Sequence, residues 1–153
     1  MAKITAKQEY IARRRVARKL SLMAMYQWHL NDDDFLSIYA YYQEEKDMAS
    51  DLRKSDTAYF KALTEVAMNT TEKLDAQISP YLDRPIEQVG PVEHSVLLLG
   101  AVELNNHLDV GFKTVVNEWV NLCKKFGPEG AHKFINSILD KLAAEVRKDE
   151  MKQ

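Results

Sequence analysis

Apolar residues recur at helical spacing along most of the chain, and we find no run that alternates with the period of two expected for a strand. Glycine and proline fall mainly at the breaks between these periodic stretches. The pattern therefore predicts an all-α fold of about six to seven helices joined by short loops. The predicted helices cover residues 8–30, 35–45, 55–80, 91–108, 112–126 and 131–148, with a short turn at 85–89.

The predicted helix at residues 91–108 is the most apolar and carries three consecutive leucines at positions 97–99. A helix that is apolar most of the way round normally lies at the centre of a core or an interface. A chain of 153 residues is long enough to bury such a core without disulfides or a metal. We expect one domain over residues 1–153, with a flexible basic tail at residues 1–8 and a frayed tail at residues 149–153.

Composition excludes several classes of protein. Cys123 is the only cysteine, so neither an intramolecular disulfide nor a thiolate metal cluster is expected. No apolar run approaches the length of a membrane span, and the charged N-terminus lacks a signal core, which favours a cytoplasmic protein. The four histidines show no metal-ligand spacing, and we find neither a glycine-rich nucleotide loop nor a nucleophile–base motif. The sequence therefore predicts a protein that is not an enzyme and holds no cofactor or metal.

Charge is distributed unevenly along the chain. The formal net charge is -2, which as an average argues against nucleic-acid binding. Residues 1–20, however, contain seven Lys or Arg residues and one Glu, a net charge of +6, so the other 133 residues sum to -8. The N-terminal segment is a local basic region on an acidic chain.

Helical geometry, at about 100° per residue, places the basic residues of the first helix on one side. Arg14, Arg15 and Arg18 form a stripe that also includes Lys19 and Tyr26, opposite an apolar side that faces the core. Guanidinium groups bind phosphates in a bidentate manner, and a base can stack on a tyrosine ring, so the stripe suits single-stranded RNA. The alternative is a solvated basic face, or one that pairs with the acidic segment at residues 32–51.

Short segments spread over nearly the whole chain, beginning with the arginine run, follow one another in the order and at the helix positions of a known family. They are residues 13–18, 25–28, 56–60, 80–82, 89–93, 103–104, 115–118, 125–127, 132–136 and 138–140. In these segments the chain resembles the NusB family of bacterial transcription antitermination factors. No single motif is decisive, but the combination is specific.

The resemblance implies a NusB-like fold of two small helical bundles and no catalysis. It also implies binding of the single-stranded boxA segment of nascent RNA together with NusE, a ribosomal small-subunit protein. Such complexes join other Nus factors on RNA polymerase and support ribosomal RNA transcription and antitermination. Two alternatives stay open: a helical adaptor or homodimer that buries the basic face, and, less favoured, the NusB-like domain that precedes some ribosomal RNA methyltransferases.

Carried over by position, the resemblance assigns roles to individual residues. Three arginines would hold RNA phosphates, Tyr26 would contact a base, and Glu93 would lie where the RNA surface meets the NusE surface. The last two helices would contribute an RNA-contacting wall. The full set comprises Arg14, Arg15, Arg18, Tyr26, Glu93, Phe126, His132, Lys133 and Phe134.

Each assignment has a plainer interpretation. Phe126 and Phe134 occupy helical core positions, His132 can be an ordinary surface residue, and Glu93 suits the first turn of any helix. The chain also departs from the family pattern. Gly130 and Ala131 stand where an acidic–small pair is common, Leu98 and Val102 differ from frequent Arg and Tyr, and the segment at 32–51 is longer and more acidic than usual. We interpret that acidic segment as solvated and not as a site.

Overall fold

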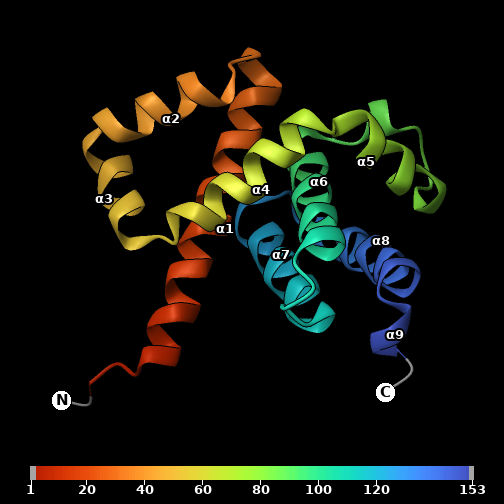
Figure 1. The fold of residues 1–153 in the computed structure, drawn as a ribbon. Coiled ribbons are helices and arrows are strands. Elements are labelled where there is room, and N and C mark those ends of the chain that lie inside the picture. Colours follow the sequence, from red (N-terminus) through yellow and green to blue (C-terminus); the bar gives the residue numbers. More distant parts are fainter. Residues whose placement is uncertain (1–2, 152–153) are drawn as a thin grey trace. The chain divides into compact units, whose positions relative to one another are not determined.

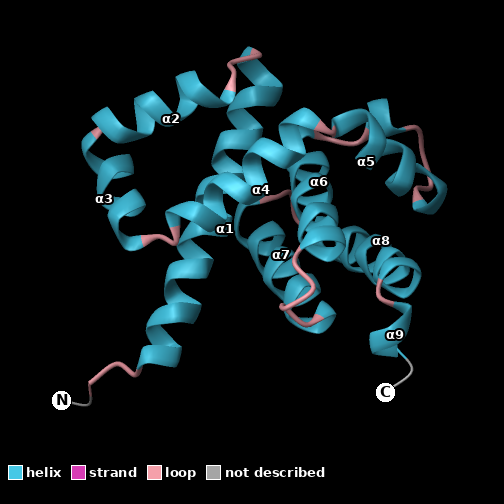
Figure 2. Ribbon diagram, viewed as in Figure 1, coloured by secondary structure: helices cyan, strands magenta, loops and turns pink. Residues whose placement is uncertain are grey.

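The computed structural model describes residues 3–151, and every regular element in that range is a helix (Figures 1 and 2). The predicted all-α fold is therefore confirmed, but the described residues form nine α-helices instead of the six to seven predicted. Contacts between residues group the chain into two compact units, one up to Val66 and one from Ala67 onward. Each unit is a small helical bundle, as the resemblance implies, and whether the two together form one RNA-binding domain stays a prediction.

The first unit begins with the long helix α1 (Ala6–Asn31). Thr5 closes its N-terminus with a capping box, in which Thr5 Oγ1 accepts from the Gln8 backbone N–H at 3.0 Å and Gln8 Oε1 accepts from the Thr5 N–H at 2.9 Å. The predicted flexible tail at residues 1–8 is therefore wrong for residues 6–8, which are helical. Residues 1–2 lie outside the described part of the chain.

The helix α2 (Phe35–Glu44) matches the helix predicted at residues 35–45, and it is followed by α3 (Lys46–Lys54), which the sequence does not predict. Asp34 caps α2, and its hydrogen bond from the Ser37 backbone N–H lowers the pKa of the Asp34 carboxyl. Glu45 is the residue at which α2 ends, and it also caps α3. Its carboxylate accepts from the Met48 backbone N–H at 2.8 Å. Leu52 is the only buried residue of α3, so the sequence of this helix shows no apolar periodicity.

The predicted helix at residues 55–80 is divided into α4 (Thr57–Asn69) and α5 (Thr71–Ile78). Thr70, with φ -126° and ψ 27°, leaves the helical region between them. The Thr71 hydroxyl donates to the carbonyl of Ala67 at 2.9 Å and stabilises the break. The boundary between the two units falls inside α4.

The second unit is built around α6 (Pro91–Asn106), on which α7 (Phe112–Phe126) and α8 (Ala131–Val146) pack. Every residue of α6 from Ser95 to Leu104 is buried, so the prediction of a central helix is confirmed. Gly100 allows close approach of α8, since a Cβ there would lie 3.0 Å from Leu139 Cδ2. Short 3₁₀ turns at Ser79–Tyr81 and Ile86–Gln88 connect α5 to α6.

Inside this unit, Trp119 of α7 donates its indole N–H to Glu103 Oε1 of α6 at 2.8 Å. Both side chains are fully buried. A carboxylate removed from water in this way depends on such donors, because burying a charge without hydrogen bonds is costly.

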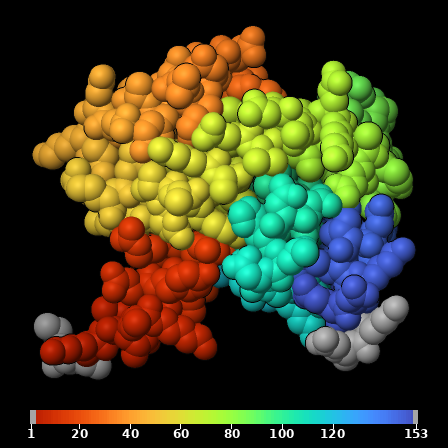
Figure 3. Space-filling model, in the orientation of Figure 1, coloured from red at the N-terminus to blue at the C-terminus, as the bar shows by residue number. Residues whose placement is uncertain are grey.

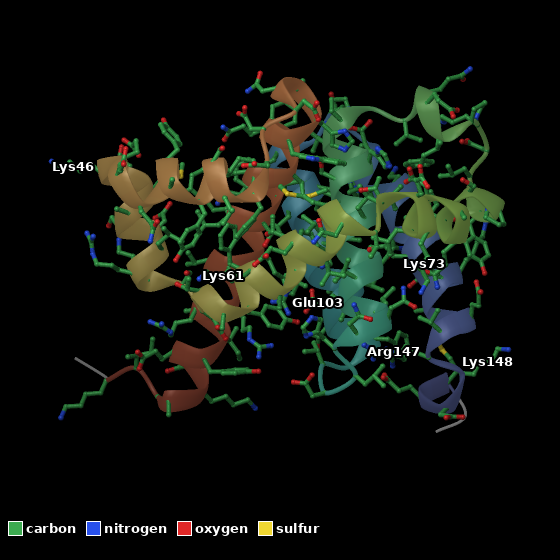
Figure 4. All side chains as sticks on the ribbon, turned by 45° about the horizontal axis from the view of Figure 1, so that its top comes forward. Lys46, Lys61, Lys73, Glu103, Arg147 and Lys148 are labelled. Atoms are coloured by element: carbon green, nitrogen blue, oxygen red, sulfur yellow. The ribbon has the colours of Figure 1, made fainter. Side chains whose placement is uncertain are left out.

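Arg147 closes the C-terminal end of α6 from the far end of α8 (Figure 4). Its buried guanidinium donates to the carbonyls of Leu104 (2.7 Å), Val110 (2.9 Å), His107 (3.0 Å) and Glu103 (3.3 Å). The last carbonyls of a helix have no partner within that helix, so this one side chain acts as its cap.

A last short helix, α9 (Lys148–Met151), follows Arg147. Glu150 accepts from the Phe112 backbone N–H at 3.0 Å and also pairs with Arg147, and these contacts lower the pKa of its carboxyl. The predicted frayed tail at residues 149–153 is therefore wrong for residues 149–151, which are helical. Residues 152–153 lie outside the described range.

Candidate RNA interface

In the first unit, Arg14 is held in a fixed position by three side chains. Its Nε donates to Asp56 Oδ2 at 3.0 Å, and its guanidinium lies 3.6 Å from the ring centroid of Tyr59 and 4.8 Å from that of Tyr10. Asp56 in turn caps α4 by accepting from the Tyr59 N–H at 3.1 Å. The contacts of Arg14 with Tyr59 and Asp56 are not predictable from α1 alone, whereas Tyr10 lies four residues before Arg14 and so on the same face of α1.

Arg18 is buried, with 4% of its surface exposed, and its guanidinium lies 5.6 Å from the Tyr59 ring centroid. The prediction of an exposed stripe is therefore wrong at this position. The helical projection considers α1 alone, whereas Tyr59 belongs to α4, which packs over the same side of α1.

Arg15 is exposed on α1, as predicted. Figure 3 shows the first turns of α1 (red) protruding from the α2–α3 part (orange to yellow) of the same unit. Lys19, one turn further along, pairs with Asp51 of α3 at 3.5 Å. The alternative of pairing with the acidic segment therefore applies to Lys19.

Tyr26 lies further along α1, about 16 Å from Arg15 along the helix axis. Tyr26 is 39% exposed. An exposed ring at this distance from an exposed guanidinium can take a base while the guanidinium holds a phosphate.

In the second unit, Phe134 at the start of α8 carries a cation on its ring. The guanidinium of Arg84, from the connection before α6, lies 4.7 Å from the Phe134 ring centroid. Arg84 also pairs with Asp83 at 2.8 Å, and this pair, with a smaller effect of Glu93, raises the pKa of Arg84. Sequence reasoning missed Arg84, because nothing in the pattern of its exposed loop indicates a contact with α8.

Glu93 lies in the first turn of α6, over Gly90. A Cβ at Gly90 would lie 2.8 Å from Glu93 Oε2, so glycine leaves the space that this carboxylate occupies. Burial, with the negative charge of Glu93, raises the pKa of Cys123 to about 11. Glu93 therefore acts electrostatically on both Arg84 and Cys123. The loop that carries Arg84, the first turn of α6 and the end of α7 thus lie near each other within the second unit.

The remaining predicted residues surround the turn between α7 and α8. Phe126 is 42% exposed, which disfavours its interpretation as plain core, and the Lys125 ammonium lies 5.6 Å from its ring centroid. Lys133 is exposed, and His132 and Phe134 are half-buried. Gly130 has φ +82°, a conformation that side chains rarely adopt, so the departure from the family pattern there has a backbone reason.

The predicted residues thus fall into two groups, each with a cation–aromatic pair. The first-unit group is Arg14, Arg15, Arg18 and Tyr26, and the second-unit group is Glu93, Phe126, His132, Lys133 and Phe134.

Among residues 3–151, no three His, Cys, Asp or Glu side chains are grouped so that they could hold a metal ion. In the same range, no helix combines the length and apolar character needed to cross a membrane.

The model of the NusB family matches residues 15–144. The chain belongs to the NusB family. It is 43% identical over 138 residues to the transcription antitermination protein NusB of Ralstonia pickettii, covering 90% of this chain and 86% of that one. It is 39% identical over 150 residues to the NusB protein of Cupriavidus pinatubonensis, covering 98% and 87%.

The NusB fold is also found in solved structures. A crystal structure of the antitermination factors NusB and NusE in complex with double-stranded RNA matches with a TM-score of 0.68 and 25% identity, covering 86% of this chain and 96% of that one. Members of the NusB family are transcription antitermination factors, so the prediction that the chain is not an enzyme is confirmed.

Proposed function

We propose that this chain binds single-stranded, boxA-type RNA together with a NusE-type ribosomal protein. In this role it joins other Nus factors on RNA polymerase in the cytoplasm and supports ribosomal RNA transcription. The observation that carries the proposal is the first-unit group, in which Arg14 is pre-positioned between two rings while Arg15 and Tyr26 are exposed. The NusB relative in complex with NusE and RNA supports the choice of partners.

Single-stranded RNA is favoured over a duplex by the exposed aromatic rings. Tyr26 and Phe126 are 39% and 42% exposed. Proteins read unpaired bases by stacking them on such rings, whereas the bases of a duplex are stacked on each other and are not accessible.

Replacing Arg15 by glutamine should flatten the salt dependence of RNA binding. Each neutralised phosphate contributes about -0.7 to the slope of log affinity against log salt for single strands, so the slope should lose about one such contribution. Fluorescence anisotropy of a labelled boxA-type RNA over a salt series measures this slope. Lys113→Gln, an equal charge change at an exposed residue of α7, is the control and should leave the slope unchanged. An unchanged slope in the Arg15 variant would remove the basic face of α1 from the RNA site.

Replacing Tyr26 by alanine should weaken binding by about 1 kcal/mol and leave the salt slope unchanged. Stacking on an aromatic ring contributes ~1–3 kcal/mol per base, and the lower end suits a side chain that is 39% exposed. The same anisotropy series measures both quantities. A change in slope without a change in affinity at low salt would contradict the role in stacking.

The alternative is a homodimer or helical adaptor that buries the basic face. It predicts that sedimentation of the free protein shows self-association with rising concentration, and that RNA competes with it. Binding of RNA by the monomer, strengthened by NusE, favours the proposed function instead.

A further inference from the structure

The first unit contains a concave surface whose lining includes none of the residues assigned to RNA above. It lies between α2, α3 and the start of α4 and has a volume of about 250 Å³. Sites for drug-sized ligands usually measure roughly 300–1,000 Å³, so this groove suits a smaller group, such as one planar ring system. The residues that line it are Tyr39, Gln43, Ala49, Leu52, Arg53 and Thr57.

Tyr39 gives the groove a fixed aromatic wall. Its ring lies nearly parallel to Phe35, with centroids 5.7 Å apart at 26°, and to Phe60, at 6.3 Å and 21°. The Lys61 ammonium, on the first half of α4, lies 4.5 Å from the Tyr39 ring centroid (Figure 4). The Lys61 side chain occupies one face of this ring, so a ligand that stacks on that face has to displace a flexible side chain. The ring itself is already ordered by its neighbours and loses little conformational freedom.

Polar groups on the other walls can read the edge of a bound ring. Gln43 offers an amide with donors and an acceptor, and Arg53 an exposed guanidinium. The Thr57 hydroxyl donates to the Leu52 carbonyl at 3.1 Å and also lies 3.1 Å from the Ser55 hydroxyl, and its oxygen has a further lone pair that can accept. Ala49 and Leu52 supply apolar surface between these groups. A stacking face, mixed donors and acceptors, and a cation together match the chemistry of a nucleobase on a phosphate chain.

The groove is joined to the arginine run of α1 by backbone contacts. Arg13 Nη1 donates to the Arg53 carbonyl at 3.5 Å, and the Asp56 N–H donates to the Arg13 carbonyl at 3.1 Å. Arg13, Arg53 and Lys54 are all exposed. A basic surface therefore leads from the start of α1 to the edge of the groove.

The acidic residues of this segment do not line the groove. Glu45 caps α3, and Asp51 pairs with Lys19. At about 100° per residue, Glu44 lies about 120° round α2 from the lining positions, and Asp47 lies about 170° round α3 from them. The acidic composition of residues 32–51 predicts a solvated segment without a site. In the structure, the acidic side chains of α2 and α3 lie on other faces of these helices than the residues that line the groove.

We propose that this groove binds one unpaired nucleobase of an RNA strand that continues past Arg13 from the basic face of α1. The inference rests on the proposed function and extends it, since it assigns the strand a further contact on α2, α3 and α4. It adds the residues Tyr39, Gln43 and Arg53 to the RNA-binding surface of the chain.

The test compares three labelled RNAs: a minimal boxA-type strand and the same strand extended by unpaired uridines at its 5′ or its 3′ end. One of the extended strands should bind the wild-type chain about tenfold more tightly than the minimal strand, which corresponds to a single stacked base. Tyr39→Leu should abolish that gain and leave binding of the minimal strand unchanged. Placing 4-thiouridine in the extension should yield a photo-crosslink to the peptide that contains Tyr39.

Variants at two exposed positions test the same groove if Tyr39→Leu does not fold. Arg53→Gln and Gln43→Ala should each reduce the gain from the extension by about three- to tenfold, while Lys113→Gln, with the same charge change as Arg53→Gln, should not. Thermal melts should show that the two groove variants are folded.

The outcomes separate the two proposals. If the minimal strand binds but neither extension adds affinity, or if all three groove variants keep the gain, the groove is not an RNA site and the proposed function stands. If the wild-type chain fails to bind even the minimal strand with NusE present, the proposed function itself is overturned.

Discussion

Replacing Arg147 by methionine should lower the free energy of unfolding by about 3–5 kcal/mol. The side chain is 3% exposed and donates to four backbone carbonyls at and beyond the end of α6. Methionine fills similar space but donates no hydrogen bond. The carbonyls of Leu104 and Val110 then lose this donor, and those of Glu103 and His107 keep only a backbone donor. The carboxylate of Glu150 loses its cation. Urea denaturation followed by circular dichroism measures the loss.

Lys148→Met is the matched control, because it makes the same kind of change at the adjacent, exposed residue. A surface substitution of this kind should stay within about 0.5 kcal/mol. Equal stability of the two variants would show that the Arg147 contacts contribute nothing to the fold.

Replacing Trp119 by phenylalanine should cost about 3 kcal/mol. The change removes the indole N–H that donates to Glu103 and leaves a space in the core between α6 and α7. Trp28→Phe, at the only other tryptophan, should cost less, since Trp28 is half-buried.

A double-variant cycle distinguishes the hydrogen bond from the lost volume. Glu103→Leu alone leaves the indole N–H without this acceptor, whereas in the Trp119→Phe background that donor is already absent. The two changes together should therefore cost at least about 1 kcal/mol less than the sum of the separate costs. Strict additivity would assign the whole effect of Trp119→Phe to packing.

Hydrophobic periodicity predicts those helices that bury a continuous apolar face. The predicted helices at 112–126 and 131–148 match α7 and nearly match α8, because glycine and proline mark the turn between them. It fails at α3, whose single buried residue leaves no period to detect, and at Thr70, where one backbone conformation divides a continuous pattern into α4 and α5.

The exposure of a candidate interface residue is predictable from sequence only where its own helix determines it. Arg15 and Tyr26 are exposed where the projection of α1 places them. Arg18 is not, because Tyr59, more than forty positions away in the chain, covers it. Likewise, the contact of Arg84 with Phe134 joins a loop to a helix fifty residues later, and no local pattern encodes such a pairing.

The position of Arg147 has a consequence for the order of folding during synthesis. The residue that satisfies the end of α6 lies 43 positions after Leu104, beyond α7 and α8. Until residue 147 has left the ribosome, the Leu104 carbonyl at the end of this buried helix lacks the side-chain donor that it has in the folded chain. The second unit therefore reaches its final stability late, whereas the contacts of Arg14 with Tyr59 and Asp56 require no residue beyond the start of α4. Contacts that are distant in sequence form slowly, so we expect the first unit to become ordered while the second is still being made.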